Sequence, residues 1–158
     1  MPTQAPQRQT EHSALSSSDE ARVFWVQPEH VAQFWHLGEY FIRQACKRGP
    51  GHLNPSNLRQ SCEAGHSQYF VAIYHGECVA SAVTSVTIDW PSGHKVLEWT
   101  ALGGKDHDNW FCLEGIVIEA AKQHGCMTMR SYSRMGMKRL LEPIGYKPVG
   151  VILEKEIQ

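Results

Sequence analysis

Residues 96–104 read VLEWTALGG, and residues 105–133 continue KDHDNWFCLEGIVIEAAKQHGCMTMRSYS. The first run predicts a β-strand that ends at Gly103-Gly104, and Asn109 is a residue type that often caps the start of a helix. Apolar residues then recur at helical spacing until Gly125, and residues 126–133 return to a β pattern. The helical apolar positions are Trp110, Leu113, Val117, Ala120 and Ala121. A strand, a helix and a second strand in this order predict a βαβ crossover with two parallel strands.

The segments on either side of this crossover give the rest of an α/β (α+β) pattern. Turn residues separate runs with strand or helix periodicity. The elements expected are a strand at 23–26, helices at 28–48 and 54–65, strands at 68–74, 78–88 and 94–102, the crossover, a short helix at 135–141 and a last strand at 147–157. His75-Gly76 is the predicted hairpin turn, because Gly accepts the positive φ that such a turn needs. In the last strand Val149, Val151 and Leu153 alternate with other residues.

Composition predicts one globular domain with a flexible tail. The chain has 158 residues, of which 42% are hydrophobic and 20% charged, enough for a single core. Residues 1–21 are rich in Gln, Ser and Pro and are expected to be disordered, which leaves 22–158 as the folded domain. Five scattered cysteines, no signal-type start and no apolar run of about 18 residues favour a cytoplasmic protein with reduced thiols and no membrane span.

The nearly balanced charge of the chain argues against partners that bind strongly charged proteins, such as nucleic acid. Lys and Arg total 15 against 16 Asp and Glu, a net charge of -1, so nothing draws the whole chain to nucleic acid. A local basic stretch between Lys122 and Lys147 keeps nucleic-acid binding as a minor alternative beside a solvated helix face. The Cys62/His66 and His124/Cys126 pairs lack zinc-site spacing, so no metal is expected.

The start of the central helix has two interpretations. Backbone N–H groups and the positive end of the helix dipole meet there, which favours a bound phosphate or other anion. Glycines before a helix are also common in plain tight turns, and spacing alone leaves both interpretations open.

Several short motifs in this order resemble the GNAT superfamily of acetyl-CoA-dependent N-acetyltransferases, and within it GNAT-like proteins of tailed bacteriophages and prophages. The residues that carry the resemblance are Leu102-Gly103-Gly104, Trp110, Leu113, Ile118-Glu119-Ala120, Gly125-Cys126, Ser133-Arg134-Met135-Gly136, Arg139-Leu140, Gly145-Tyr146 and Leu153-Glu154-Lys155. It spans about residues 23–157 and is most specific in the C-terminal half. It implies one domain with a mixed, mostly antiparallel sheet, splayed between its fourth and fifth strands and flanked by about four helices.

The resemblance further implies acetyl-CoA as co-substrate, an amine as acceptor, and a site in the split of the sheet. The residues that it assigns to the cofactor are Thr100, Leu102, Gly103, Gly104, Lys105, Asp108, Asn109, Trp110, Ser131, Ser133 and Arg134. Pyrophosphate would bind at residues 103–108, and the thioester carbonyl would meet a backbone N–H of the strand at 96–102.

Glu98, Tyr132 and Tyr146 are the candidate catalytic residues. A half-buried Glu98 on the fourth strand has the chemistry of a general base, and the two phenols are candidate general acids. Each also has a purely structural interpretation, as a solvent-facing carboxylate or as an amphipathic ring at the edge of the core. The sequence carries no pattern that identifies the acceptor amine.

A second function from another class stays open, namely a GNAT-shaped binding or virion-associated protein without turnover. Two differences from the family pattern favour it. The spacing of the glycines and the lysine in residues 103–106 differs from that of the family's pyrophosphate loop. Leu141 stands where many members have a Tyr that acts as the general acid.

Overall fold

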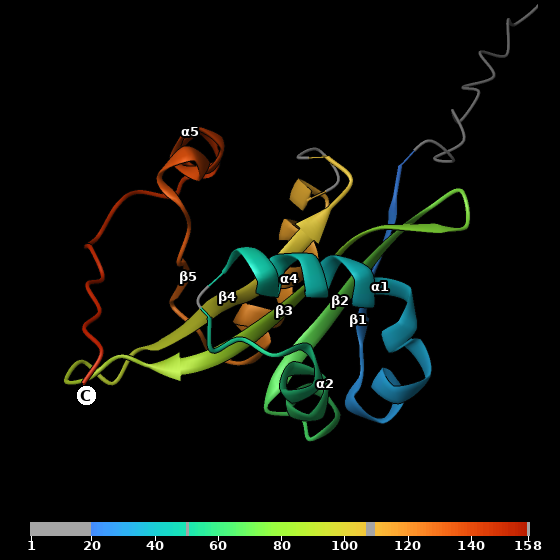
Figure 1. Ribbon diagram of the computed structural model, residues 1–158, viewed down its shortest axis with the longest axis horizontal. Helices are drawn as coiled ribbons and strands as arrows, with labels where there is room; N and C mark the ends of the chain where they lie inside the picture. The colour runs from blue at the N-terminus through green and yellow to red at the C-terminus, as the bar shows by residue number, and fades with distance from the viewer. Residues whose placement is uncertain (1–19, 50, 107–109, 158) are drawn as a thin grey trace, which may run out of the picture.

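The computed structural model describes residues 20–49, 51–106 and 110–157, and within them one mixed five-stranded sheet organises the chain. The strands are β1 (Arg22–Val26), β2 (Ser67–Tyr74), β3 (Glu77–Ile88), β4 (Lys95–Gly104) and β5 (Thr128–Ser131), and their order in the sheet is the same as in the sequence (Figure 1). β1 to β4 pair antiparallel, and β5 pairs parallel to β4. The predicted α/β class and the parallel βαβ crossover are therefore confirmed.

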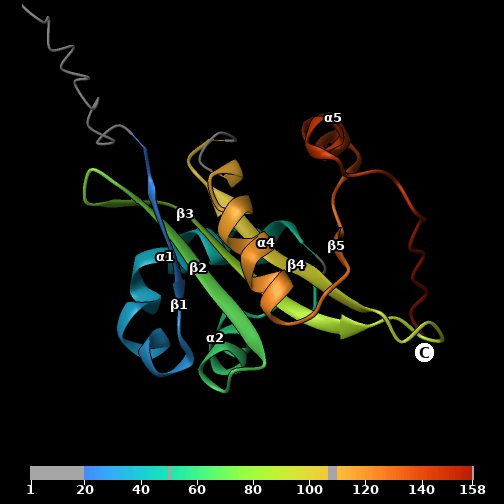
Figure 2. The same cartoon turned by 180° about the vertical axis from the view of Figure 1, so that it is seen from behind.

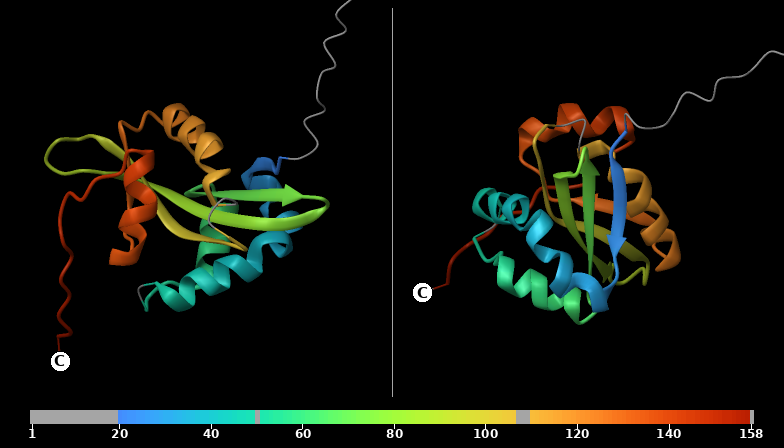
Figure 3. Two further views of the ribbon diagram at one scale, coloured as in Figure 1. Left: turned by 90° about the horizontal axis from the view of Figure 1, so that it is seen from above. Right: turned by 90° about the vertical axis from the view of Figure 1, so that its right-hand side faces the viewer.

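Three helices cover the two faces of the sheet, namely α1 (Pro28–Arg48), α2 (Pro55–Glu63) and α4 (Glu114–Gln123). A short fourth helix, α5 (Lys138–Leu141), has 3-10 turns on either side, η1 (Met135–Met137) and η2 (Glu142–Ile144). The end-on view shows α1 and α2 on one face and α4 on the other (Figure 3). α5 lies beyond the β5 edge, together with the C-terminal segment (Figure 2).

Two hydrophobic cores follow from the two-residue period of the strands. The α1 core joins Val31 and Ile42 of α1 to Tyr69, Val71 and the other side chains on that face of the sheet. The α4 core joins α4 to the side chains in between, which include Phe70, Ala72, Leu97, Val117 and Ala120. Alternate strand residues thus belong to different cores, as expected for a sheet that is buried on both faces.

The N-terminus of α2 is capped by Asn54. The Asn54 Oδ1 atom accepts hydrogen bonds from the Ser56 and Asn57 backbone N–H groups, at 2.8 and 3.3 Å. These N–H groups have no partner within the helix, so the cap satisfies them.

Asn54→Ala is therefore expected to lower the free energy of unfolding by about 1 kcal/mol, because two donors at the helix start lose their acceptor. Asn57→Ala is the control, since Asn57 contributes only its backbone to this cap and an exposed change of this kind costs about 0.5 kcal/mol or less. Urea unfolding of the two variants measures the difference. Equal losses in both would show that the cap does not stabilise the protein.

A β-bulge interrupts β4 at Thr100. Val83 of β3 pairs with Ala101, but the next residue, Thr84, pairs with Trp99, so Thr100 is the extra residue. The alternation of β4 reverses there: Leu97 belongs to the α4 core and Ala101 to the α1 core. A bulge bends and twists its strand, and here it lies where β4 and β5 separate.

The splay between β4 and β5 is visible in their register. Pairing runs from Val96 with Thr128 to Trp99 with Ser131, and β4 then continues to Gly104 without a β5 partner in the described residues. The backbone groups of residues 100–104 that point toward β5 are therefore available to a ligand. The predicted splay between the fourth and fifth strands is confirmed.

The prediction of a C-terminal strand at residues 147–157 is wrong. These residues are exposed and form no strand, although Val149, Val151 and Leu153 alternate as predicted. A strand exists only when its backbone pairs with a neighbour, and no other strand in the described residues pairs with this segment.

The helix predicted to run from Asn109 through Ala121 is interrupted. Asn109 lies outside the described residues, Trp110 and Phe111 are helical, and α4 begins at Glu114. The Leu113 N–H donates to the Trp110 carbonyl, only three residues back, so the chain makes a tighter turn before α4 begins. The predicted tail at residues 1–21 lies almost wholly outside the described residues as well.

None of the helices in residues 20–49, 51–106 and 110–157 is long and apolar enough to cross a membrane. The same residues contain no group of three or more His, Cys, Asp or Glu side chains placed to hold a metal ion.

Candidate functional site

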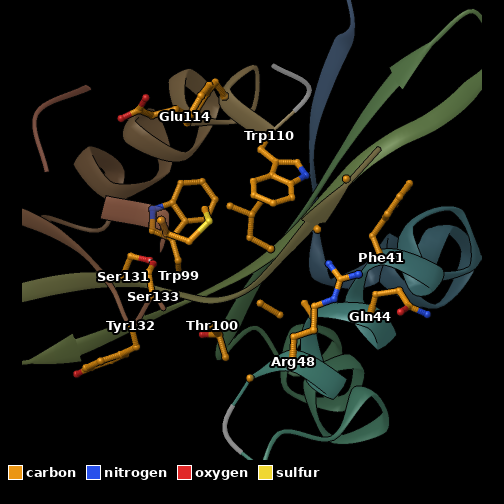
Figure 4. A pocket seen from close by; sticks show the side chains of 18 of the residues that line it. Phe41, Gln44, Arg48, Trp99, Thr100, Trp110, Glu114, Ser131, Tyr132 and Ser133 are labelled. Carbon is orange, nitrogen blue, oxygen red and sulfur yellow. The ribbon is translucent and has the colours of Figure 1, made fainter. Parts of the chain in front are cut away.

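A cavity of about 850 Å³ opens where β4 and β5 separate. One wall comes from the C-terminal half of α1, another from Trp110, Phe111 and the start of α4, and a third from the chain between β5 and η2. Figure 4 shows Arg48 and Gln44 on the α1 side and Trp99, Trp110 and Glu114 on the α4 side. The cavity therefore reaches through the splay from one face of the sheet to the other.

Most of the residues assigned to the cofactor by resemblance line this cavity. They are Thr100, Leu102, Gly103, Gly104, Lys105, Trp110, Ser131, Ser133 and Arg134. Asp108 and Asn109 lie outside the described residues. Tyr132 and Tyr146 also line the cavity, whereas Glu98 is not among its lining residues.

Gly103 and Gly104 are needed because Phe41 and Trp110 pack closely against them. A Cβ atom at Gly104 would lie 2.2 Å from Trp110 Cδ1, and one at Gly103 would lie 2.7 Å from the Phe41 carbonyl oxygen. Both distances are far below van der Waals contact, so only glycine fits. A Gly104→Glu change would displace Trp110, and its effect on ligand binding would not by itself demonstrate a phosphate site.

Thr100 is held at the bulge by a neighbouring hydroxyl. Its Oγ1 atom lies 3.1 Å from Ser85 Oγ, on the α1 side of the sheet. Across the splay, the Ser131 and Ser133 hydroxyls are hydrogen-bonded to each other, so these two side chains lie on the same side of the chain. Thr100, Ser131 and Ser133 place hydroxyl groups along both sides of the opening.

Tyr146 lines the cavity and is held in place by a hydrogen bond. Trp99 Nε1 donates a hydrogen bond of 2.8 Å to Tyr146 Oη, which fixes the phenol against β4. Burial raises the pKa of Tyr146 above its usual value, an effect that the Trp99 hydrogen bond partly opposes and the charge of Glu114 reinforces. Tyr146 thus keeps its proton at neutral pH, as a general acid must.

Glu98 is part of a charged cluster beside the cavity. Its Oε1 atom accepts hydrogen bonds from Arg130 at 3.3 Å and from the Tyr132 hydroxyl at 3.1 Å, and its side chain is 18% exposed. Arg130 also binds both carboxylate oxygens of Asp89, at 3.0 Å each, and this interaction raises the pKa of Arg130. Tyr132 lines the cavity and is the link between it and the Glu98 carboxylate.

Cationic side chains stand at several points of the cavity wall. Lys105 is paired with Glu77 at 2.7 Å, and this hydrogen bond lowers the pKa of Glu77. Arg48 and Arg134 line the cavity and have exposed side chains. Glu77 and Glu114 line the same cavity and Glu77 neutralises Lys105, so the charges left for an anionic group are those of Arg48 and Arg134.

Sequence reasoning missed Arg48, Gln44 and Glu114 as site residues. Arg48 and Gln44 lie near the end of a regular amphipathic helix, and nothing in its periodicity distinguishes a side chain that lines a cavity from one that faces solvent. Burial raises the pKa of Glu114, which stands in the first turn of α4. The break before α4 that brings Glu114 to the cavity has no glycine or proline to signal it.

Neither a protein-family model nor a curated protein sequence matches this chain. Solved structures do match it over most of its length. An aminoglycoside acetyltransferase from an uncultured soil metagenomic sample is 12% identical with a TM-score of 0.66, and the match covers 87% of this chain and 99% of that one. An aminoglycoside N-acetyltransferase in complex with CoA is 14% identical with a TM-score of 0.67, covering 87% and 95%.

A ribosomal-protein-alanine N-acetyltransferase from Brucella melitensis is 10% identical with a TM-score of 0.63, covering 87% of this chain and 99% of that one. Identities this low show a shared fold and nothing finer. The chain is therefore a single α/β domain with the GNAT fold.

Proposed function

We propose that this protein is an acetyl-CoA-dependent N-acetyltransferase, which transfers an acetyl group to an amine of a small molecule or a protein. The observation that carries the proposal is the cavity at the splay, where the β4 bulge, the free edge of residues 100–104 and the Tyr146 phenol meet. Solved structures with this fold include N-acetyltransferases and one complex with CoA, which supports the same class of activity.

The described residues fit the pantetheine arm of acetyl-CoA. A volume of about 850 Å³ is within the range of small-molecule sites, which is about 300–1,000 Å³. The unpaired backbone of residues 100–104 and the hydroxyls of Ser131 and Ser133 offer hydrogen bonds to the amides of the arm. Lys105 and Arg134 would hold its phosphates.

Tyr146 acts as the proton donor in this reaction, and Glu98 acts with Tyr132 as the proton acceptor. An acceptor nitrogen attacks the thioester carbonyl carbon, the C–S bond breaks, and the leaving sulfur takes the phenolic proton of Tyr146. The proton lost by the nitrogen passes through the Tyr132 hydroxyl to Glu98, which already accepts a hydrogen bond from it at 3.1 Å. A backbone N–H at the Thr100 bulge polarises the carbonyl as negative charge develops on its oxygen.

The resemblance to proteins of tailed bacteriophages and prophages adds a setting to this proposal. The transfer would take place in the cytoplasm of a bacterial cell that carries the phage, on a host or phage amine. A virion-associated role is the corresponding setting for the alternative function described below.

Titration with acetyl-CoA in a calorimeter tests the cofactor site directly. We expect micromolar binding by the native protein, and at least a tenfold weaker affinity for Ser133→Trp, because an indole at this exposed wall position would fill the opening. Ser56→Trp is the matched control, since Ser56 is exposed on α2 and is not among the cavity-lining residues. Dephospho-CoA and desulfo-CoA separate the contribution of the nucleotide end from that of the thioester end.

Absence of binding at millimolar acetyl-CoA would contradict the proposal. It would favour the alternative, a protein with the GNAT fold that binds a partner without turnover. That alternative has one specific observation in its favour: Arg130 holds the Glu98 carboxylate in an ion pair at 3.3 Å, a structural role that needs no acceptor amine. An acetyl-transfer assay with a panel of amines then decides between turnover and binding alone.

A further inference from the structure

The two faces of the sheet divide the cavity into two sides with different chemistry. Leu97 belongs to the α4 core, so the next side chain, Glu98, points to the α1 side. Trp99 packs against the α4 core again and holds the Tyr146 phenol. The phenol that protonates the leaving sulfur is therefore separated from the carboxylate that takes the amine proton. An acceptor amine that gives its proton to Glu98 must lie on the α1 side.

The α1 side of the cavity is lined by one stripe of α1 side chains. Leu37, Phe41, Gln44 and Arg48 follow one another at three- and four-residue steps, and all four line the cavity. Tyr40 lines it beside them and is 66% exposed. The stripe thus has an apolar end and a polar end, and Gln44 and Arg48 form the polar end.

Arg48 has no carboxylate partner among the described residues. Other arginines of α1 and α2 do have one: Arg43 is paired with Glu39 at 2.7 Å, and Arg59 with Glu63 at 2.6 Å. A guanidinium can bind a carboxylate with two parallel hydrogen bonds. An unpaired arginine on the wall of a cavity of ligand size is therefore suited to a carboxylate of the ligand.

We propose that the acceptor is a small amino acid with an apolar side chain, whose carboxylate binds Arg48 and whose amine faces Tyr132 and Glu98. The inference rests on the proposed function and names the class of its acceptor. In the view of Figure 4, Thr100 lies between Tyr132 and Arg48. The two charged ends of the amino acid would thus lie on either side of the β4 bulge, and its side chain would contact the apolar end of the α1 stripe.

The charges around the cavity fit a zwitterion better than an acceptor with several ammonium groups. Glu77 is paired with Lys105 at 2.7 Å, and Glu114 lies on the α4 side of the opening (Figure 4). On the α1 side, the described lining residues offer no unpaired carboxylate to a second or third ammonium group, whereas Arg48 would repel it. One amine near Glu98 and one carboxylate at Arg48 complement both charges.

Titration of the CoA-saturated protein with N-acetyl-L-phenylalanine and with N-acetyl-L-phenylalaninamide tests the carboxylate contact without turnover. The probes have the form of transfer products and differ by one negative charge. We expect the carboxylate to bind at least tenfold more tightly than the amide, because it adds charge-assisted hydrogen bonds to Arg48. Arg48→Gln should abolish this preference. Arg48→Lys should keep part of it, since an ammonium group retains the charge and loses the paired geometry.

Lys47→Gln is the matched control for Arg48→Gln. Lys47 lies in the same last turn of α1, so the change removes the same charge from the same end of the helix dipole, but Lys47 does not line this cavity. It should keep the tenfold preference. In the transfer assay, Arg48→Gln should raise KM for L-phenylalanine at least tenfold and change KM for acetyl-CoA by less than twofold.

Four results would overturn the proposal. Equal affinity of the native protein for the two probes, with CoA bound, would exclude a carboxylate site and leave the proposed function standing. An equal loss in Arg48→Gln and Lys47→Gln would assign the effect to net charge. A raised KM for acetyl-CoA in Arg48→Gln would assign Arg48 to the cofactor phosphates. Failure of the native protein to bind CoA at all would remove the proposed function, and the acceptor class with it.

Discussion

Tyr146→Phe is expected to lower kcat for acetyl transfer by about a hundredfold, with little change in the affinity for acetyl-CoA. The phenol lines the cavity and is fixed by Trp99 at 2.8 Å, so its loss removes a positioned proton donor and leaves the ring and its packing in place. General acids and bases contribute about 10²–10⁴-fold to catalysis, and the lower end applies because water can enter the open cavity and replace the donor. Steady-state kinetics at saturating acetyl-CoA measures the effect.

The pH dependence of kcat distinguishes an acid from a structural tyrosine. A general acid must be protonated, so activity falls as the pH rises through its pKa. Because burial raises the pKa of Tyr146 above its usual value of 10, we expect the alkaline limb of the native enzyme to lie above pH 10. This limb should disappear in Tyr146→Phe.

Two further variants complete this experiment. Trp99→Phe should give an intermediate loss of kcat, because the phenol remains but its hydrogen-bond donor is gone. Tyr74→Phe on β2 is the control and should behave like the native chain, since Tyr74 is not among the residues that line the cavity. A kcat for Tyr146→Phe within twofold of the native value would rule out its role as the acid.

Gly38→Ala is expected to lower the free energy of unfolding by about 2 kcal/mol or more, although alanine is the better helix former. Gly38 lies inside α1 where the helix meets the sheet, and a Cβ atom there would lie 2.4 Å from Ser81 Cβ and 2.6 Å from Tyr69 Oη. The same contact holds two hydrogen bonds: the Gly38 N–H donates to Tyr69 at 3.0 Å, and the Ser81 hydroxyl donates to the Gly38 carbonyl at 2.7 Å. A methyl group must separate the helix from both partners.

Gly115→Ala is the matched control for Gly38→Ala. Gly115 is also helical, in the first turn of α4, and a Cβ atom there would meet nothing within 4 Å. We expect this change to be neutral or to stabilise the protein by up to about 1 kcal/mol, since only the helix propensity changes. Thermal unfolding separates the pair, because a loss of 2 kcal/mol lowers the Tm of a domain of this size by roughly 4–8 °C. If Gly38→Ala were as stable as Gly115→Ala, the result would contradict the close approach of α1 to β3 at Gly38.

The order of elements could be predicted from local pattern. The hydrophobic period of α1, the His75-Gly76 turn and the run from β4 through α4 to β5 each contain their own signal, and the structure confirms all three. The β-bulge at Thr100 could not be predicted, because nothing in VLEWTALGG marks the extra residue. Its position depends on how β3 aligns with β4.

The candidate site shows the same division. The glycine pair and the serines at 131 and 133 could be found from their spacing and from the resemblance to a family. Arg48 and Glu114 could not, because each belongs to a helix whose own pattern is complete without a ligand. Which helix side chains line the cavity depends on the angle at which α1 and α4 cross the sheet, and that angle is set by packing.

By itself, the sequence determined the class of the fold and the position of its βαβ crossover. These two features depend on residue period and on turn chemistry, which act between neighbours in the chain, whereas the opening of the sheet was implied by the resemblance to a family. Only the tertiary structure decided that Trp99 holds Tyr146, that Arg130 and Tyr132 bind Glu98, and that residues 147–157 pair with no strand in the part of the chain that the structure describes. Hydrogen bonds such as these join residues about 30 to 50 positions apart, and no local pattern encodes a contact that exists only once the two segments have been packed together.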